Sequence, residues 1–513
     1  MVLKFSLSLR DLSGEWSHDG IRWSSGQSWI EPFAHSQVES LAVTDGTSWA
    51  LTVRERCSAT ADGSASAVVL DGDVSSVLEE WRSWPLGAVV LHVRHGRLTL
   101  SAGACGGVAP VHLVSSGSRL HGSWDMRDLR RHVSGDRLVG REVARMLTGH
   151  ARYGHETLFE GVRLLTVGSV AAFSPIGLVL RYPAPVGRDQ PRELAAAADP
   201  VTAFEELLAW VLKQRPVSAR RAALQLSGGQ DSATVGLSLG AVFPDAVRSC
   251  AMELPGAAGA QQMARRAVLA EACRLAGDVT VGALDFLPVH PAGVRRVGWC
   301  SPYDEPYAEL LEGLLARLTA RGVETVFTGF GGDELMAVGG GSETVRARPW
   351  LGPVVRELET ERDAGIAPPT LVPATALLAL RTVSAPMLRA GVWPVAPLAD
   401  PHVVRFARWL PHEWRADKRL MRERLVRRGL PGHVVRPALR ENFREVMAAA
   451  LHRHAPALLR EMAAGSPLVE GGFLDRDALL AVADECERGV REAAEHCAVY
   501  APISMHLALR SAA

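Results

Sequence analysis

Lysine is scarce in this chain of 513 residues. Of its 56 basic residues only three are lysines, Lys4, Lys213 and Lys418, and arginine supplies the rest. Arginine cannot replace lysine where a compact ammonium group must approach a reacting centre. A lysine kept in such a chain is therefore a candidate for a catalytic role, although this argument alone does not choose among the three.

Excess charge and long apolar runs are absent as well. Lysine plus arginine equals aspartate plus glutamate at 56 each, which excludes a nucleic-acid-binding protein that works by bulk charge. No apolar segment reaches membrane-spanning length, and Met1–Arg10 is too short and polar for a signal peptide. The seven cysteines form no Cys-x-x-Cys pair, so we expect reduced, mostly buried thiols. The sequence predicts a cytoplasmic protein without nucleic-acid or membrane partners.

The length requires two or more domains. Residues 1–185 contain short apolar runs, such as Ala88–Val93, between Gly- and Ser-rich turns, which indicates strands. Residues 186–200 are rich in Pro, Ala and charge and are predicted to be a linker. Residues 201–513 form the second predicted domain, which becomes mostly helical from about Pro394.

Strands and helices alternate in the second domain. We predict strands over 222–226, 247–254, 279–286 and 325–328, and helices over 233–239, 261–275 and 307–320. Such alternation is typical of a parallel sheet with right-handed crossovers. Ligands of these sheets bind beyond the carboxyl ends of the strands, where two glycine clusters of this sequence also fall.

The first cluster is Ser227–Ser232, with the sequence Ser-Gly-Gly-Gln-Asp-Ser. Its two glycines permit a tight turn whose N–H groups point inward, and the next helix presents its positive N-terminus. Together with the hydroxyls of Ser227 and Ser232, this turn is suited to a phosphate chain. Asp231 would repel phosphate without a cation, so we predict that it binds Mg²⁺. The absence of a Gly-Lys-Ser/Thr ending disfavours a Walker-type loop.

The second cluster is Thr328–Glu334, with the sequence Thr-Gly-Phe-Gly-Gly-Asp-Glu. Asp333 is predicted to be the second Mg²⁺ ligand, opposite Asp231. Glu334 is expected to stabilise the N-terminus of the following helix. Taken alone, this second cluster could be only a capped turn, but paired with the first cluster it becomes specific.

The two clusters, in their order and spacing, resemble the synthetase domain of asparagine synthetases, β-lactam synthetases and lasso-peptide macrolactam cyclases, which is part of the ATP pyrophosphatase superfamily. Further resemblances to this family lie in Pro397–Asp400, with the predicted helix after it, and in the lysine segment Asp417–Arg419. Ser123–Asp125 and Glu156–Val162 resemble its N-terminal glutaminase-like half.

The resemblance implies an α/β protein. Its N-terminal domain would be an Ntn-type, glutaminase-like β-sandwich, and its C-terminal domain an ATP-pyrophosphatase domain with a parallel sheet and a helical end. Lys418 would be the catalytic lysine, which neutralises charge at the α-phosphate, and Asp231 and Asp333 would act with it through Mg²⁺. The implied ATP-binding residues are Leu226, Ser227, Gly228, Gly229, Asp231, Ser232, Met252, Gly329, Gly331 and Lys418.

Three departures from the family pattern restrict the activity. A glutaminase of this family needs cysteine directly after the initiator methionine, where this chain has Val2, so the first domain is not expected to hydrolyse glutamine. Phe330 stands where asparagine synthetases have Glu and β-lactam synthetases have Tyr, and it cannot move a proton. Val395 and Ala396 stand where the family usually has an arginine.

The resemblance and these departures favour a lasso-peptide macrolactam synthetase. It would adenylate an Asp or Glu side chain of a precursor peptide with ATP and Mg²⁺, and the peptide's N-terminal amine would then close the ring. The implied partners are this peptide, a leader-peptide-binding protein and a leader protease. The alternatives are a β-lactam or carbapenam-type synthetase acting on a small amino diacid, and a catalytically silent ATP-binding scaffold. The general base stays open among Glu357, Glu359, Glu361 and Asp363.

Overall fold

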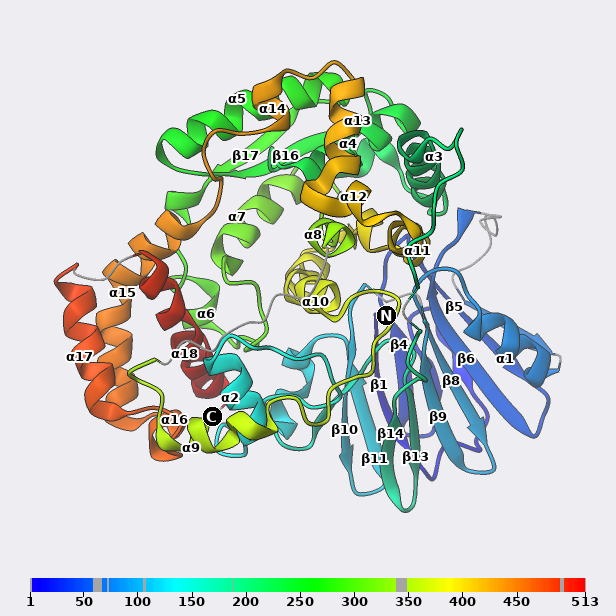
Figure 1. Ribbon diagram of the computed structural model, residues 1–513. Coiled ribbons are helices and arrows are strands. Elements are labelled where there is room, and N and C mark those ends of the chain that lie inside the picture. The colour runs from blue at the N-terminus through cyan, green and yellow to red at the C-terminus, as the bar shows by residue number, and fades with distance from the viewer. Residues whose placement is uncertain are drawn as a thin grey trace.

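The computed structural model describes residues 2–58, 67–71, 73–104, 108–187, 189–337, 348–489 and 493–512. Two seven-stranded sheets from the first part of the chain lie face to face at the lower right of Figure 1. A five-stranded parallel sheet with its helices lies above them, and the long helices α15 (Arg444–Gly465), α17 (Arg476–Glu487) and α18 (Ala493–Ala512) lie at the left. The fold is therefore mixed α/β, as the sequence predicts.

The two sheets of the first part are antiparallel except for one edge pair, β5 with β7. The first sheet has the order β12-β10-β11-β1-β4-β3-β2, and its strands are β1 (Leu3–Ser8), β2 (Ser17–His18), β3 (Trp23–Ser25), β4 (Ser28–Pro32), β10 (Val111–Ser116), β11 (Arg119–Ser123) and β12 (Val162–Leu165). The second has the order β14-β13-β9-β8-β6-β5-β7, and its strands are β5 (Val38–Thr44), β6 (Ser48–Glu55), β7 (Ala67–Asp71), β8 (Ala88–Arg94), β9 (Arg97–Ala102), β13 (Val170–Ser174) and β14 (Gly177–Arg181). The central strand β8 is rich in valine and almost wholly buried, as expected for a strand covered on both faces.

The third sheet is parallel throughout and has the order β17-β16-β15-β18-β19. Its strands are β15 (Ala222–Gln225), β16 (Arg248–Glu253), β17 (Asp278–Gly282), β18 (Thr325–Phe327) and β19 (Trp393–Val395), and the helices that follow or cover them are α4 (Gln230–Val242), α5 (Gly256–Ala272), α7 (Ala308–Thr319) and α10 (Ala374–Arg389). The chain proceeds outward from β15 to β17 and then returns to the other side of β15 with β18. The strand order therefore reverses between β15 and β18, and the carboxyl ends of these two strands form the crevice where such sheets bind ligands.

The structure confirms the predicted strands and helices of this sheet but changes some of their bounds. The strand predicted over 279–286 ends at Gly282, because Ala283–Asp285 turn into a 3-10 helix. The sequence does not predict the edge strand β19, because its three residues include Pro394, and proline is tolerated only at sheet edges. Helix α10 was also missed.

The two halves of the chain share one apolar core. A single cluster of buried side chains joins Phe5 and Trp23 of the antiparallel sheets to Leu224, Phe327 and Trp393 of the parallel sheet. No helix or strand lies between β14 and α3 (Pro200–Lys213) among the described residues, and Asp199 caps α3. The boundaries at 185 and 200 stay a prediction, because packing continues across them.

Polar contacts reinforce this shared core. Asp125, from the Ser123–Asp125 segment, accepts a 2.7 Å hydrogen bond from Arg389 Nε in α10. Trp393 Nε1 donates to Glu55 Oε1 across 2.9 Å, and Arg215 Nε donates to the same oxygen across 2.7 Å. The buried carboxylate of Glu55 thus ties the edge of the parallel sheet to β6.

Candidate active site

The first glycine cluster connects β15 to α4 at the crevice. Gly228 has φ +89°, a left-handed conformation that favours glycine. The serine hydroxyls close the turn on itself: Ser227 and Ser232 Oγ atoms lie 3.1 Å apart, and Ser232 Oγ also donates to Gly229 O. No side chain caps the N-terminus of α4, so its first N–H groups are available to an anion.

The second glycine cluster packs directly against the first. A Cβ atom at Gly329 would come within 2.8 Å of Ser232 N, and one at Gly332 would overlap the Asp231 carboxylate. Gly331 has φ +91°, and a Cβ there would lie 3.0 Å from Ala399 N in the Pro397–Asp400 segment. Glycine is therefore required at these positions by contact between segments that are distant in the sequence.

Lys418 joins the two clusters through its ammonium group. Its Nζ atom lies 2.7 Å from both carboxylate oxygens of Asp231 and 2.6 Å from Asp333 Oδ1. Burial by itself would lower the pKa of Lys418. The attraction of the Asp231 and Asp333 carboxylates is larger than this effect, so the pKa of Lys418 is raised. The structure thus brings together the three residues that the sequence predicts to be catalytic.

The backbone at Lys418 is in an unusual conformation. Asp417 and Lys418 have φ values of +49° and +52°, a region that non-glycine residues seldom occupy. These residues form a kink between the short helix His412–Arg415 and α13 (Arg419–Arg427). Strain of this kind is typical of functional sites, and here it turns the lysine toward the carboxylates.

A cavity of about 390 Å³ opens between the two clusters. Its lining residues are Gln225, Ser227, Gly229, Asp231, Ser232, Thr328, Gly329, Phe330, Gly331, Gly332, Asp333, Glu334 and Ala379. Thr328 Oγ1 is buried and has no hydrogen-bond partner among the described residues. An unsatisfied buried hydroxyl in a cavity wall is unfavourable unless a ligand pairs with it.

Four of the predicted nucleotide-binding residues are not among those that line this cavity: Leu226, Gly228, Met252 and Lys418. Leu226 is fully buried, its N–H donates to Cys250 O, and its carbonyl accepts from Arg266 Nε. Met252 O accepts from Gln262 Nε2. Their predicted contacts with ATP stay a prediction.

The sequence reasoning missed a carboxylate beside the phosphate-binding turn. Glu441 Oε2 lies 3.4 Å from the point where Gly228 would carry a Cβ, and it pairs with buried Arg265 at 2.6 Å. Gln261 Nε2 donates to Glu441 Oε1 and to Leu439 O, which ties this segment to α5. Nothing in the spacing of the sequence indicates that Glu441 returns to the turn.

The residues present fit a nucleotide's phosphate chain. The uncapped start of α4, the close approach permitted by three glycines and the orphaned Thr328 hydroxyl all favour an oxyanion ligand. For the metal, the Asp231 and Asp333 carboxylates are the hard oxygen donors that Mg²⁺ prefers. The described residues contain no group of three or more His, Cys, Asp or Glu side chains placed to hold a metal. A metal here would therefore depend on phosphate and water for its other ligands.

The structure places the remaining predicted residues as follows. Val2, at the position of the expected nucleophilic cysteine, is fully buried in the core. Phe330 is half-buried and lines the active-site cavity. None of the four candidate bases lines it; Glu361 and Asp363 instead pair with Arg141 and Arg152 in another part of the molecule. The five cysteines whose side chains are described are buried, as predicted.

Residues 203–389 match the family model of asparagine synthase. This match supports an asparagine synthetase-related family and, with it, an enzyme of the ATP-dependent, amide-forming ligase type. The matched segment contains both glycine clusters but ends before Lys418.

No curated protein matches the sequence significantly. A solved structure of glutamine phosphoribosylpyrophosphate amidotransferase from B. subtilis, complexed with ADP and GMP, is 10% identical; the alignment covers 74% of this chain and 92% of that chain, at a TM-score of 0.22. A TM-score this low supports no conclusion about fold or ligand. No described helix is long and apolar enough to cross a membrane.

Proposed function

We propose that this chain is a peptide macrolactam synthetase of the kind that matures lasso peptides. The observation that carries the amide-forming chemistry is the contact of Lys418 Nζ with Asp231 and Asp333 at the crevice between β15 and β18. One ammonium group and two carboxylates beside an anion-binding turn suit the activation of a carboxylate by ATP. The proposal assigns this chemistry to a side-chain carboxylate of a peptide.

The residues of the site would divide the work between binding and charge stabilisation. Ser227–Ser232 and the N-terminus of α4 would hold the phosphates, and Asp231 and Asp333 would hold Mg²⁺. When bound, Mg²⁺ would neutralise the departing pyrophosphate. The substrate carboxylate oxygen would attack the α-phosphorus, giving an acyl-adenylate and pyrophosphate. Lys418 would then stabilise the negative charge that develops at the α-phosphate and at the carbonyl oxygen.

The amine that completes the bond must be supplied by the substrate. Buried Val2 offers no thiol for glutamine hydrolysis, so the proposed reaction uses an amine of the substrate. In the proposed reaction the peptide's N-terminal amine attacks the acyl carbon, AMP leaves, and the amine loses one proton. Phe330 contributes an apolar wall rather than a proton donor, which favours a peptide over the small diacids of tyrosine-bearing relatives.

Pyrophosphate release by the purified chain with ATP and Mg²⁺ tests the proposal. A leader-cleaved core peptide is compared with small amino diacids, and products are weighed by mass spectrometry. Peptide-dependent release with a product lighter by one water supports the proposal. Pyrophosphate release with a small diacid but not with the peptide would favour the β-lactam-type alternative. The assay is repeated with a leader-peptide-binding protein and a leader protease present. No release with either substrate under those conditions would favour the silent scaffold.

Variants of the two aspartates test, in the same assay, whether pyrophosphate release depends on this site. Asp231→Asn and Asp333→Asn should each abolish peptide-dependent release, because each removes a carboxylate from the metal and from Lys418. Asp477→Asn is the control, since Asp477 is exposed in the first turn of α17. Unchanged activity in both active-site variants would refute the metal assignment.

A further inference from the structure

A second, larger cavity of about 600 Å³ lies between the two halves of the chain. Helix α2 (Gly140–Leu147) forms one side, and α9 (Pro353–Glu357) with the 3-10 turn Leu358–Glu361 forms the other. The described residues that line this cavity and the active-site cavity do not overlap. Its volume is typical of a small-molecule site, and such sites favour boundaries between packed units.

The walls combine apolar surface with an excess of positive charge. Leu351, Val355 and Leu358 provide the apolar part. Among the described residues, five guanidinium groups but a single carboxylate, that of Glu359, line the cavity; the arginines are Arg141, Arg145, Arg348, Arg356 and Arg362. A ligand that complements these walls has an apolar body and a negative charge.

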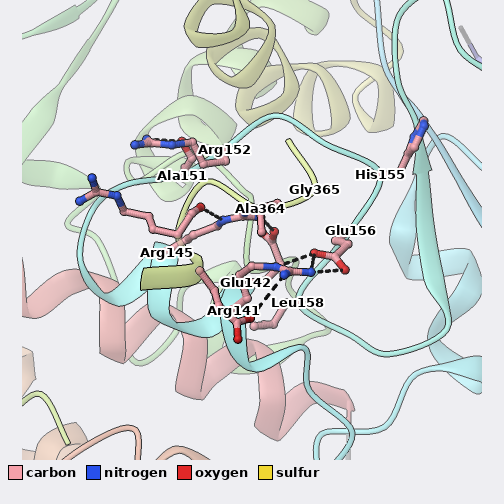
Figure 2. A network of polar contacts seen from close by, with 12 residues as sticks. Arg141, Glu142, Arg145, Ala151, Arg152, His155, Glu156, Leu158, Ala364 and Gly365 are labelled. Carbon is pink, nitrogen blue, oxygen red and sulfur yellow. Dashed lines mark hydrogen bonds and ion pairs between the residues drawn. The ribbon is translucent and has the colours of Figure 1, made fainter. Parts of the chain in front are cut away.

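Two of these arginines are fully engaged in holding the walls together. Arg141 binds both oxygens of Glu156 at 2.8 Å, as Figure 2 shows. Arg145 is buried, pairs with Glu142, and donates from Nε to the carbonyl of Arg362 across 2.8 Å. Arg145 Nη2 also donates to Ala364 O, so Arg145 fixes the 362–364 segment on α2 and the cavity is built by the fold rather than left by loose packing.

Arg356 and Arg362 are different, because neither makes an ion pair with a described carboxylate. Arg356 is exposed, and Nη2 donates only to Leu351 O, at 3.2 Å. Arg362 Nε is buried and has no hydrogen-bond partner among the described residues. A buried donor without an acceptor is unfavourable, and an oxyanion from a ligand would satisfy it.

We propose that this cavity binds an organic carboxylate with an apolar body, and that Arg356 and Arg362 hold the carboxylate. The planar guanidinium fork matches a carboxylate, while Glu359 at the same wall disfavours a doubly charged phosphate. The apolar part lies against Leu351, Val355 and Leu358. A free carboxylic acid and the carboxyl end of a peptide share this chemistry. The inference stands independently of the proposed ligase activity.

Isothermal titration calorimetry of the full chain with two carboxylates tests the site. The probes are N-acetyl-phenylalanine and the acetylated tetrapeptide Ala-Ala-Ala-Phe, each compared with its carboxamide. We expect at least one acid to bind with a Kd below about 1 mM. Its amide should bind at least about tenfold more weakly, because the charge-assisted hydrogen bonds are lost. Binding of the peptide alone identifies a peptide end as the ligand, and binding of both identifies a free acid as sufficient.

Variants connect this binding to the cavity. Arg356→Gln and Arg362→Gln should each weaken the acid by about tenfold or more. Arg97→Gln is the matched control, since Arg97 is an exposed arginine at the β8–β9 hairpin, and it should bind like the wild type. Because Arg356 is exposed, its variant keeps the test valid if Arg362→Gln impairs folding. Equal binding of acid and amide, unchanged binding by Arg356→Gln, or no binding of either acid at about 10 mM would overturn the inference.

Discussion

The Nζ atom of Lys418 lies 2.7 Å from both carboxylate oxygens of Asp231, although the two residues belong to segments far apart in the sequence. The scarcity of lysine singles out three positions, and the structure places one of them at the carboxyl edge of the parallel sheet. The opposite charges hold each other in place. The position of Lys418 is therefore preorganised by the fold.

Lys418→Met is expected to lower turnover by about 10²- to 10³-fold, because it removes the cation that stabilises the developing charge. Lys418→Arg should restore little of this loss, since the planar guanidinium does not reproduce the compact contact with both aspartates. Peptide-dependent pyrophosphate release measures the effect. Lys213→Met is the control, because Lys213 is exposed at the end of α3. Wild-type turnover by Lys418→Met would remove the lysine from the mechanism.

Gly332→Ala is expected to weaken binding of Mg²⁺-ATP by about tenfold. The added methyl group would overlap the Asp231 carboxylate and displace it from Lys418. Calorimetry with Mg²⁺-ATP measures the loss without needing the second substrate. Gly432→Ala is the matched control, because nothing lies within 4 Å of a Cβ at Gly432. Equal affinity in the two variants would contradict the close packing of the two glycine clusters.

Glu441→Ala is expected to destabilise the fold by about 3 kcal/mol, because it leaves the buried guanidinium of Arg265 without its carboxylate. Denaturant unfolding monitored by fluorescence measures the loss. Glu445→Ala removes an exposed carboxylate from the first turn of α15 and should change stability by no more than about 0.5 kcal/mol. A small effect at Glu441 would mean that solvent and Val434 O, which accepts a 3.0 Å hydrogen bond from Arg265 Nη2, satisfy the guanidinium sufficiently.

His112 should make the protein less stable in acid. Burial, with a contribution from Arg381, lowers the pKa of His112 to about 3 in the folded protein, whereas a histidine in the unfolded chain titrates near 6.5. As the pH falls below about 6.5, the unfolded state takes up the proton first, so the free energy of unfolding falls until the pH reaches about 3. This one residue contributes at most about 1.4 kcal/mol per pH unit over that window.

The comparison variant for this prediction is His112→Gln, which cannot take up the proton. Denaturant unfolding at pH 7, 6 and 5 should give a shallower decline in the variant than in the wild type. Parallel declines would show that other groups, such as His121 with its pKa of about 4, dominate the acid sensitivity.

The loops of the site can be predicted from the sequence because they depend on local chemistry. Glycine pairs after apolar runs fix the turns at Ser227–Ser232 and Thr328–Glu334, and the strand–helix alternation places both at one sheet edge. The resemblance implies that Asp231, Asp333 and Lys418 act together, and in the structure the Lys418 ammonium group contacts both carboxylates. These features need only the residues themselves and the handedness of the crossovers.

The missed features depend on long-range contacts. The edge strand β19 is three residues long and is stabilised by Glu55 and by the ring of His35, which stacks on Trp393 at 5.3 Å. Glu441 reaches Gly228 only because Arg265 and Gln261 on α5 hold it there. Hydrophobic periodicity carries no signal for such contacts.

The junction of Trp393 with Glu55 determines whether the chain can be shortened. A fragment that begins after β14 would lose the Glu55 carboxylate and the His35 ring that contact Trp393, and the indole of this edge strand would face water. Exposed edges of this kind pair with other chains, so the fragment would aggregate rather than fold. The antiparallel half of the molecule is therefore expected to be required for folding, because its Glu55 binds the edge strand of the parallel sheet.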